Sequence, residues 1–227
     1  MNIKNKIFGE LVKIRDIFSD YSVRSYSQEG EDLVLARFFG NKKNGFYVDI
    51  GANHPKKYSN TYYFYKKGWF GINIDPLPES KKLFDKYRKR DINLNIGISN
   101  ESGKMKYYMF EESQLNTFSE KVKNERKKNV KKIVSEIDIK LEKLSFILDK
   151  YVKNKKIDFF SIDTEGFDFN VLKSNDWEKY RPKVIIVELF TESSNKLFKD
   201  KVFLFLKSKN YDYFAKTGNS VFFKRVD

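Results

Sequence analysis

Apolar side chains in the first 22 residues recur every three or four positions, a spacing that predicts an amphipathic helix over residues 1–22. One interpretation is that this helix docks onto the rest of the chain or onto a second subunit in a homodimer. Another is attachment to a membrane surface. The apolar positions are Ile3, Ile7, Leu11, Ile14 and Phe18.

Beyond residue 22, short apolar runs alternate with helical periodicity. The predicted helices are 28–39 (capped by Ser27), 79–90, 140–151 and 195–207. The predicted strands are 46–50, 69–74, 92–98, 104–110, 157–162, 184–189, 211–215 and 220–224. This order predicts an α/β fold with a Rossmann-like, doubly wound, mainly parallel sheet, in which 104–110 is an inserted hairpin strand and the last two runs form a C-terminal antiparallel hairpin. No repeat or linker divides residues 23–227, so a single domain is expected.

Composition limits the classes of protein. The chain has 227 residues, 40% apolar and 17% aromatic, which favours one folded domain over disorder. The absence of cysteine excludes disulfides, thiolate metal sites and a cysteine nucleophile. There is no apolar run of about 20 residues for a membrane span and no signal peptide pattern, so a cytoplasmic location is expected.

The net charge of +14 indicates an acidic partner: nucleic acid, anionic lipid or a phosphorylated small molecule. The densest basic run, residues 121–132, has no aromatic residue for stacking on bases. It is therefore interpreted as a solvated helix or a mobile loop, and binding to nucleic acid is the less favoured reading.

The stretch GFYVDIGANHP, residues 45–55, predicts a strand that runs into a tight turn at Gly51. At the carboxyl end of a strand in an open α/β sheet, such a turn is a usual place for a ligand. The next strand ends in Asp75, whose carboxylate would accept hydrogen bonds from both ribose hydroxyls of an adenosine. Asn53 and Lys56 stand where a dinucleotide fingerprint needs glycines, which favours S-adenosylmethionine over NAD.

A series of short motifs, in order, resembles the FkbM-type S-adenosylmethionine-dependent methyltransferases over residues 25–225. The motifs are YSQEGED (26–32), VDIGAN (48–53), SNTY (59–62), NID (73–75) and SIDTEG (161–166). The resemblance implies a class I methyltransferase fold. It also implies a donor site around the Gly51 turn, with Asn95 and Ile96 near the adenine. The other residues expected to bind the donor are Tyr26, Gln28, Asp49, Ala52, Asn53, Asn60, Thr61 and Asp75, with a helix cap as the alternative for Asn60 and Thr61.

Three carboxylates end two strands that should face the donor: Asp163 and Glu165 after one strand and Glu188 after the next. Carboxylates at such positions are costly to bury unless they bind something, so they are candidate catalytic residues. A hydroxyl acceptor must lose a proton, which requires a general base or a metal ion. The alternative for Glu165 is hydrogen bonding to the N-terminus of the following helix.

His54, the only histidine, directly follows the donor turn. It is either structural or a fourth catalytic candidate, acting as a base or as a metal ligand. With Asp163, Glu165 and Glu188 it could form an oxygen-rich Mg²⁺ or Mn²⁺ site, although no tight ligand spacing demands one.

The predicted function is O-methylation of a sugar or related small molecule in capsule, lipopolysaccharide or secondary-metabolite biosynthesis, where the acceptor class comes from the resemblance. A phosphate- or nucleotide-linked acceptor would suit the basic surface. The main alternative is an RNA or DNA methyltransferase, although the chain lacks an Asn/Asp-Pro-Pro-aromatic motif and a cysteine for attack on a pyrimidine. A third alternative is a donor-binding interaction protein without catalysis.

Overall fold

The computed structural model describes residues 10, 19, 22–129, 131–191 and 193–226. The predicted amphipathic helix over residues 1–22, and with it the homodimer contact, falls almost wholly outside these residues and stays a prediction.

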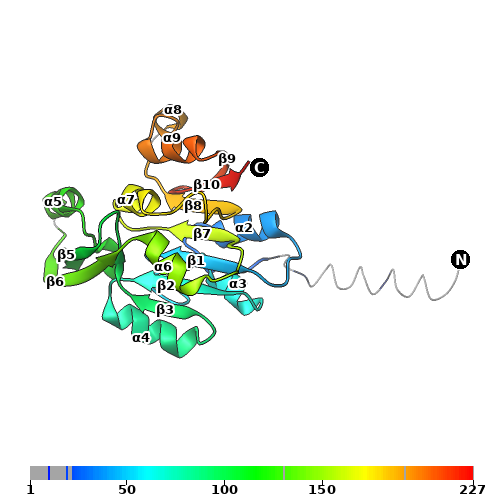
Figure 1. The fold of residues 1–227 in the computed structure, drawn as a ribbon, viewed down its shortest axis with the longest axis horizontal. Helices are drawn as coiled ribbons and strands as arrows, with labels where there is room; N and C mark the ends of the chain where they lie inside the picture. The colour runs from blue at the N-terminus through cyan, green and yellow to red at the C-terminus, as the bar shows by residue number, and fades with distance from the viewer. Residues whose placement is uncertain (1–9, 11–18, 20–21, 130, 192, 227) are drawn as a thin grey trace, which may run out of the picture.

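A seven-stranded sheet forms the centre of the structure, in the order β3-β2-β1-β7-β8-β10-β9 (Figure 1). Five neighbouring strands are parallel: β3 (Ile92–Asn95), β2 (Phe70–Asp75), β1 (Phe46–Ile50), β7 (Phe159–Ile162) and β8 (Val184–Glu188). The C-terminal pair, β9 (Tyr211–Lys216) and β10 (Ser220–Arg225), is antiparallel, and β10 lies beside β8. The predicted doubly wound, mainly parallel sheet with a C-terminal hairpin is therefore confirmed.

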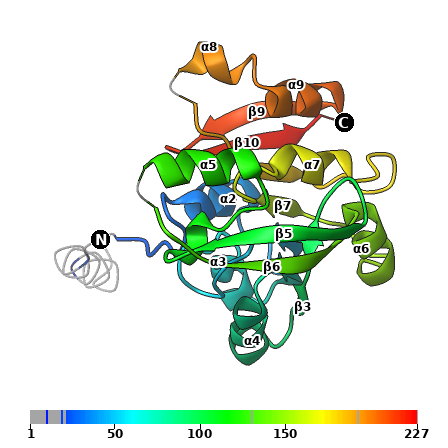
Figure 2. The same cartoon turned by 90° about the vertical axis from the view of Figure 1, so that its left-hand side faces the viewer.

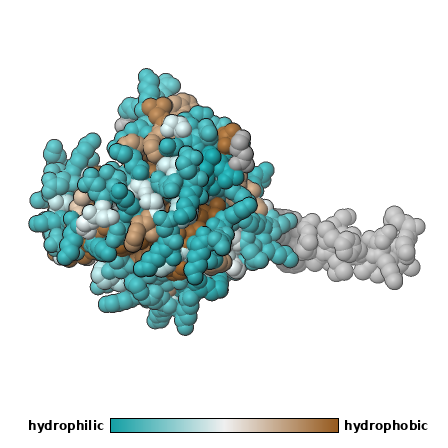
Figure 3. Space-filling view, in the orientation of Figure 1, coloured by the Kyte–Doolittle hydropathy of each residue, from teal (hydrophilic) through white to brown (hydrophobic). Residues whose placement is uncertain are grey.

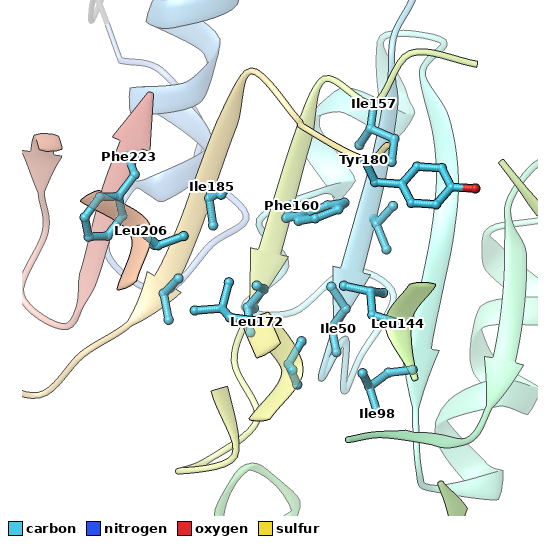
Figure 4. Packing of buried hydrophobic residues seen from close by; sticks show 14 of the residues in the cluster. Ile50, Ile98, Leu144, Ile157, Phe160, Leu172, Tyr180, Ile185, Leu206 and Phe223 are labelled. Atoms are coloured by element: carbon cyan, nitrogen blue, oxygen red, sulfur yellow. The ribbon is translucent and has the colours of Figure 1, made fainter. Parts of the chain in front are cut away.

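Helices cover both faces of this sheet, because its central strands are buried on both sides. The larger core packs Ile50, Phe160 and Ile185 against α6 (Leu144–Tyr151), α7 (Asp168–Lys173) and α9 (Lys201–Ser208), as Figure 4 shows in part. The opposite core packs the alternate strand residues, such as Tyr47 and Phe159, against α2 (Glu31–Phe39) and α3 (Tyr62–Lys66). Successive side chains along each strand thus face different helices, which fixes the strand register.

Between β3 and α6 the chain forms a second, three-stranded sheet (Figure 2). It consists of β4 (Gly97–Ile98), β5 (Gly103–Phe110) and β6 (Ile133–Glu142), in the order β4-β6-β5. The connection from β5 to β6 carries the short 3₁₀ helix η1 (Ser113–Leu115) and α5 (Glu120–Lys128). We call residues 97–142 the insertion. Residues 121–128 of the basic run belong to the helix α5, as the solvated-helix interpretation predicted; most of them are exposed, but Val122, Lys123 and Arg126 are half-buried.

Some predicted boundaries are wrong. The run 92–98 divides between two sheets, and residues 140–142 belong to β6, with α6 starting only at Leu144. Helix 195–207 is broken into α8 (Ser194–Leu197) and α9. The predicted helix 28–39 starts only at Glu31, and its N-cap residue is Gly30 instead of Ser27. Ser27 lies before the helix, where its Oγ accepts a hydrogen bond from Asp32 N at 3.2 Å. The predicted helix 79–90 is α4 (Pro78–Tyr87).

The face of the molecule in Figure 3 is mostly hydrophilic, with apolar residues in small groups. No helix in the described part of the chain combines the length and the apolar character needed to cross a bilayer.

Candidate active site

The turn after β1 brings three strands together. Gly51 adopts a left-handed conformation (φ 81°), and its N–H donates to Ile74 O in β2 at 2.9 Å. A Cβ at Gly51 would lie 1.7 Å from the carbonyl oxygen of Asp163, at the end of β7. Only glycine fits here, because any side chain would collide with the β7 backbone.

Asp75 ties the end of β2 to this turn. Its carboxylate accepts hydrogen bonds from Asn53 N and Leu77 N, both at 2.8 Å. Burial raises the pKa of Asp75 to about 6, against the opposing effect of those two amides. The group is therefore mainly ionised at neutral pH, and each oxygen keeps a lone pair for the hydroxyl of a ligand.

A cavity of about 600 Å³, including its open mouth, lies beyond the strand ends. Four of the predicted donor residues line it: Gly51, Asn53, Asp75 and Ile96. Asp163 and Glu165 lie on the same lining, and apolar side chains form much of the remainder. The insertion supplies the opposite wall, with Tyr107, Ser113, Gln114, Asn116 and Phe118. A carboxylate beside apolar walls suits the ribose and the flat adenine of S-adenosylmethionine.

Thr61 and Asn60, two other predicted donor residues, make hydrogen bonds to neighbouring protein groups and do not line the cavity. Thr61 is fully buried, and its hydroxyl donates to Asp49 Oδ2 at 2.7 Å. The buried Arg88 also donates to Thr61 Oγ1, at 3.0 Å. Asn60 donates through Nδ2 to Ser161 Oγ at 3.1 Å, which ties the loop to β7. Thr61 is the N-cap residue of α3, but its side chain makes no capping hydrogen bond.

The remaining predicted donor residues, Asn95, Ala52, Tyr26 and Gln28, are not part of the cavity lining. Asn95 Nδ2 donates to Pro76 O at 2.6 Å and so braces a lining residue, while Ala52 is buried. Tyr26 packs edge-on against Tyr62, with ring centroids 4.9 Å apart. Gln28 is exposed. The buried Asp32 explains the fold of their loop, because its carboxylate accepts from Tyr26 N and from Ser25 and Ser27 Oγ.

The three predicted catalytic carboxylates lie together. One oxygen from each of Asp163, Glu165 and Glu188 is within 4.8 Å of the others. Burial, then the negative charge of Glu165, raises the pKa of Glu188 to about 8. Burial, then the charges of Glu188 and Glu165, also raises the pKa of Asp163 well above its usual range. Asp163 and Glu188 thus form a carboxyl pair that keeps a proton at neutral pH.

Glu165 has a cationic partner that the sequence did not reveal. Arg126 of α5 donates through Nη2 to Glu165 Oε2 and through Nη1 to Leu115 O. The two side chains of the ion pair are 16% and 18% exposed. Burial raises the pKa of Glu165, and Arg126 opposes the rise. The predicted alternative for Glu165, hydrogen bonding to the N-terminus of α7, does not describe its side chain, which accepts from Arg126. The carboxylate that accepts from the backbone of this loop is Asp168, from Thr164 N at 2.9 Å.

His54 lies outside the carboxylate cluster and is absent from the cavity lining. Its Nδ1 accepts hydrogen bonds from Lys56 N (3.1 Å) and Lys57 N (2.9 Å), so it shapes the turn that follows. Burial, then the charges of Lys57 and Lys56, lowers the pKa of His54 and keeps Nδ1 free to accept. The three carboxylates, without His54, could supply oxygen ligands to Mg²⁺ or Mn²⁺. The guanidinium of Arg126 already balances part of their negative charge, through its bond to Glu165. A metal, and a catalytic role for His54, stay predictions.

Solved structures with a similar fold are methyltransferases. One is a 1,6-didemethyltoxoflavin-N1-methyltransferase from Burkholderia thailandensis with bound S-adenosylhomocysteine (TM-score 0.45, 11% identity, 99% of this chain and 88% of that chain covered). A second is the C-terminal domain of precorrin-6Y C5,15-methyltransferase from Rhodobacter capsulatus (0.43, 10%, 91% and 91%). A third is a TehB-like SAM-dependent methyltransferase from Corynebacterium glutamicum (0.42, 7%, 98% and 97%).

The strand order, the hairpin and the turn define the class I methyltransferase fold. The sequence model of the Methyltransferase FkbM domain matches residues 49–213, which is more than half of the chain. The chain therefore belongs to the FkbM methyltransferase family and uses S-adenosylmethionine as donor. No curated protein matches it significantly.

The residues that the sequence did not suggest come mainly from the insertion. The alternation at 104–110 predicted a strand, but it carried no sign that Tyr107 would face the donor cavity. The alternation in IVSEIDIKLE, residues 133–142, was a usable strand signal beside the basic run. Arg126 stood in a run of similar charges, in which nothing distinguishes the cation that pairs with Glu165.

Proposed function

We propose that this protein transfers the methyl group of S-adenosylmethionine to a hydroxyl of a sugar or a related polyhydroxylated small molecule. The observation that carries this proposal is the Asp163–Glu188 carboxyl pair at the edge of the donor cavity. A hydroxyl is a poor nucleophile until its proton is removed, and a base whose pKa lies near the working pH is best suited to remove it. Glu188, with a pKa of about 8, meets that condition.

Each residue has a separate task in this proposal. Asp75 accepts hydrogen bonds from the donor ribose, and the apolar lining excludes water from the adenine. Bound there, S-adenosylmethionine supplies a methyl group on a positively charged sulfur. The ionised carboxylate of Glu188 accepts the proton of the acceptor hydroxyl, while the neighbouring Asp163 keeps its own proton. Alignment of the two reactants by the fixed strand ends supplies a large part of the rate.

The basic surface favours an acceptor that carries phosphate or a nucleotide. Lys127, Lys131 and Lys132 line a shallow depression at the end of α5, beside the insertion strands. An acceptor of this kind is a sugar unit activated for capsule, lipopolysaccharide or secondary-metabolite assembly, which is the biosynthetic setting that we propose. Contacts with one or two phosphates would give only a modest salt dependence.

The test is a methyl-transfer assay with the purified chain against nucleotide sugars, sugar phosphates, free glycosides and a mixed RNA pool, read by mass spectrometry. We expect a mass gain of one methyl group on a sugar oxygen. Transfer to RNA alone, with a log–log salt slope near −5 or steeper, would replace the sugar proposal with a nucleic-acid methyltransferase. Binding of the donor without transfer to any acceptor would leave a donor-binding protein. Repeating the sugar reaction with a chelator, then with added Mg²⁺ or Mn²⁺, tests the metal.

A further inference from the structure

Phe190 is a bare aromatic ring just beyond the end of β8. Its side chain is 69% exposed, more than any other large apolar side chain in the part of the chain that the structure describes. It comes two residues after Glu188. Single exposed apolar residues are ordinary, so the position of Phe190, rather than its exposure alone, gives it significance.

That position lies on the acceptor side of the carboxyl pair. Asp163 lines the donor cavity, whereas Glu188 does not, although their carboxylates are neighbours. The sheet order β2-β1-β7-β8 points the same way, because the donor turn lies at β1 and β2 while Glu188 closes β8. A path from the donor cavity across Asp163 therefore reaches Glu188 and then Phe190.

The backbone that carries Phe190 is fixed on its other side. Leu189 N donates to Asn219 O at 2.8 Å, and Asn219 N donates to Glu29 Oε2 at 2.8 Å. These bonds hold the hairpin turn, the segment after β8 and the loop of the exposed Gln28 in one place. Phe190 thus stands on an anchored segment, which these hydrogen bonds connect to the loop that contains Gln28.

Two residues of this region carry a buried polar atom without a partner in the described part of the chain: Asp163, beside Glu188, and Thr191, which follows Phe190 in the sequence. Asp163 Oδ1 and Thr191 Oγ1 are buried and have no hydrogen-bond partner within the described residues. Buried polar atoms without partners are uncommon in proteins, and a ligand hydroxyl is one way to satisfy them. The surroundings of Phe190 therefore combine one apolar face with several hydrogen-bonding groups.

We infer that Phe190 is the platform on which the acceptor ring lies, and that this ring is a saturated sugar; the inference rests on the proposed function and deepens it. A sugar ring has an apolar C–H face and a rim of hydroxyls. The face would pack on Phe190 while a rim hydroxyl reaches the Asp163–Glu188 pair. This arrangement matches the mixture of one aromatic side chain and a few placed polar groups that is typical of small-molecule sites.

The experiment compares Phe190→Ala and Phe190→Tyr with Phe146→Ala, a matched control because Phe146 is also an exposed ring (54% exposed), on α6. With the sugar methylated by the wild type, Phe190→Ala should raise the acceptor KM roughly 10-fold and change kcat less. Phe190→Tyr should stay near the wild type because it keeps the ring, and Phe146→Ala should change nothing. The calorimetric Kd for S-adenosylhomocysteine should be the same in all four proteins.

Saturation-transfer NMR with methyl glycosides as probes gives a second readout, in which sugar C–H signals should weaken in Phe190→Ala. An unchanged acceptor KM in Phe190→Ala would overturn the platform and leave sugar methylation intact. An equal loss of donor affinity would also overturn it, because Phe190 would then support the fold or the donor site. If the wild type methylates only RNA and shows no saturation transfer to glycosides, the proposed function and the platform both fail.

Discussion

The two walls of the donor cavity are built in different ways. The wall formed by β1, β2 and β7 consists of strand ends held by backbone hydrogen bonds and by a glycine that no other residue can replace. The wall formed by the insertion rests on the rest of the fold through a few polar contacts and one small apolar cluster. The polar contacts are Arg126 on Glu165, Thr117 Oγ1 on Glu165 O (2.8 Å) and Ser113 Oγ on Asn53 Oδ1 (3.3 Å). In the apolar cluster, insertion residues such as Tyr107 and Phe118 pack with Leu77 and Phe167.

This difference separates two tasks. Strand ends in a packed sheet place catalytic groups accurately, because moving them would disturb the register of a buried core. A wall attached by a few polar contacts and one small apolar cluster should open at lower cost than a strand end, so we expect it to be the wall that moves when donor and product exchange. Changes in the strand-end wall should therefore impair chemistry or donor affinity strongly, and changes in the insertion should act mildly on donor binding.

Glu188→Gln should have the largest effect. It keeps the shape of the side chain but removes the base, so turnover should fall by roughly 10²–10⁴ while the donor Kd is unchanged. In the wild type the rate should rise with pH through an apparent pKa near 8, because the deprotonated form of Glu188 is active. Single-turnover methyl transfer from pH 6 to 9 measures both. A residual activity above about one tenth would show that Glu188 is not the base.

Asp75→Ala should come next and should act on the donor. Charged hydrogen bonds contribute roughly 1.5–3 kcal/mol each, so we expect donor affinity to fall by one to two orders of magnitude. Asp75→Asn should lose less, because it keeps an acceptor oxygen for Leu77 N or Asn53 N. Calorimetry with S-adenosylhomocysteine, together with a check of the melting temperature, measures the effect. Wild-type affinity in a folded Asp75→Ala protein would contradict the donor assignment.

Arg126→Gln should have a moderate effect that is confined to the insertion wall. The pair with Glu165 is partly exposed, so solvent screens it and we expect the donor KM to rise only about 3- to 10-fold. Dissociation of S-adenosylhomocysteine should become faster than in the wild type, and the rate of the chemical step should stay at its wild-type value. Lys128→Gln, an exposed cation on the same helix, is the matched control. A fall in single-turnover rate as large as in Glu188→Gln would place Arg126 in the chemistry instead.

The same division separates what the sequence predicted from what it did not. The strand-end wall and the neighbouring strand β8 could be predicted because their strands are mostly apolar runs, such as FYVDI in β1 and VIIVE in β8. These runs end at Gly51, Asp75, Asp163 and Glu188. Parallel strands end at one edge, so these residues had to meet there. The insertion was not readable in this way. Its cavity residues lie on half-buried strands and loops, and their contacts depend on how one small sheet packs on another.

The sequence also could not show which of the predicted donor residues line the cavity and which only stabilise the turn. Asn60 and Thr61 follow the donor turn closely, yet Thr61 contacts Asp49 and Arg88 below it. The buried Arg88 explains the difference, because its charge must be neutralised by Asp91 and surrounded by acceptors. The SNTY motif therefore predicted the position of the donor turn correctly, although the hydroxyl of its Thr61 stabilises the protein around the turn and does not line the donor cavity.

His54→Asn should have the smallest effect, and it tests the boundary of the strand-end wall. Asparagine can accept from the amides of Lys56 and Lys57 as His54 Nδ1 does, so the turn should survive and turnover should stay within about threefold of the wild type.

The pKa of His54 is lowered in the folded state, so the unfolded chain binds its proton more readily. Its small contribution to stability is thus present above about pH 6.5 and is lost as the pH falls below that value. The asparagine variant should lose this pH dependence, which melting curves from pH 5 to 8 would reveal. A 100-fold loss of single-turnover rate in a folded His54→Asn protein would instead make His54 the base and move the proton acceptor away from the Asp163–Glu188 pair.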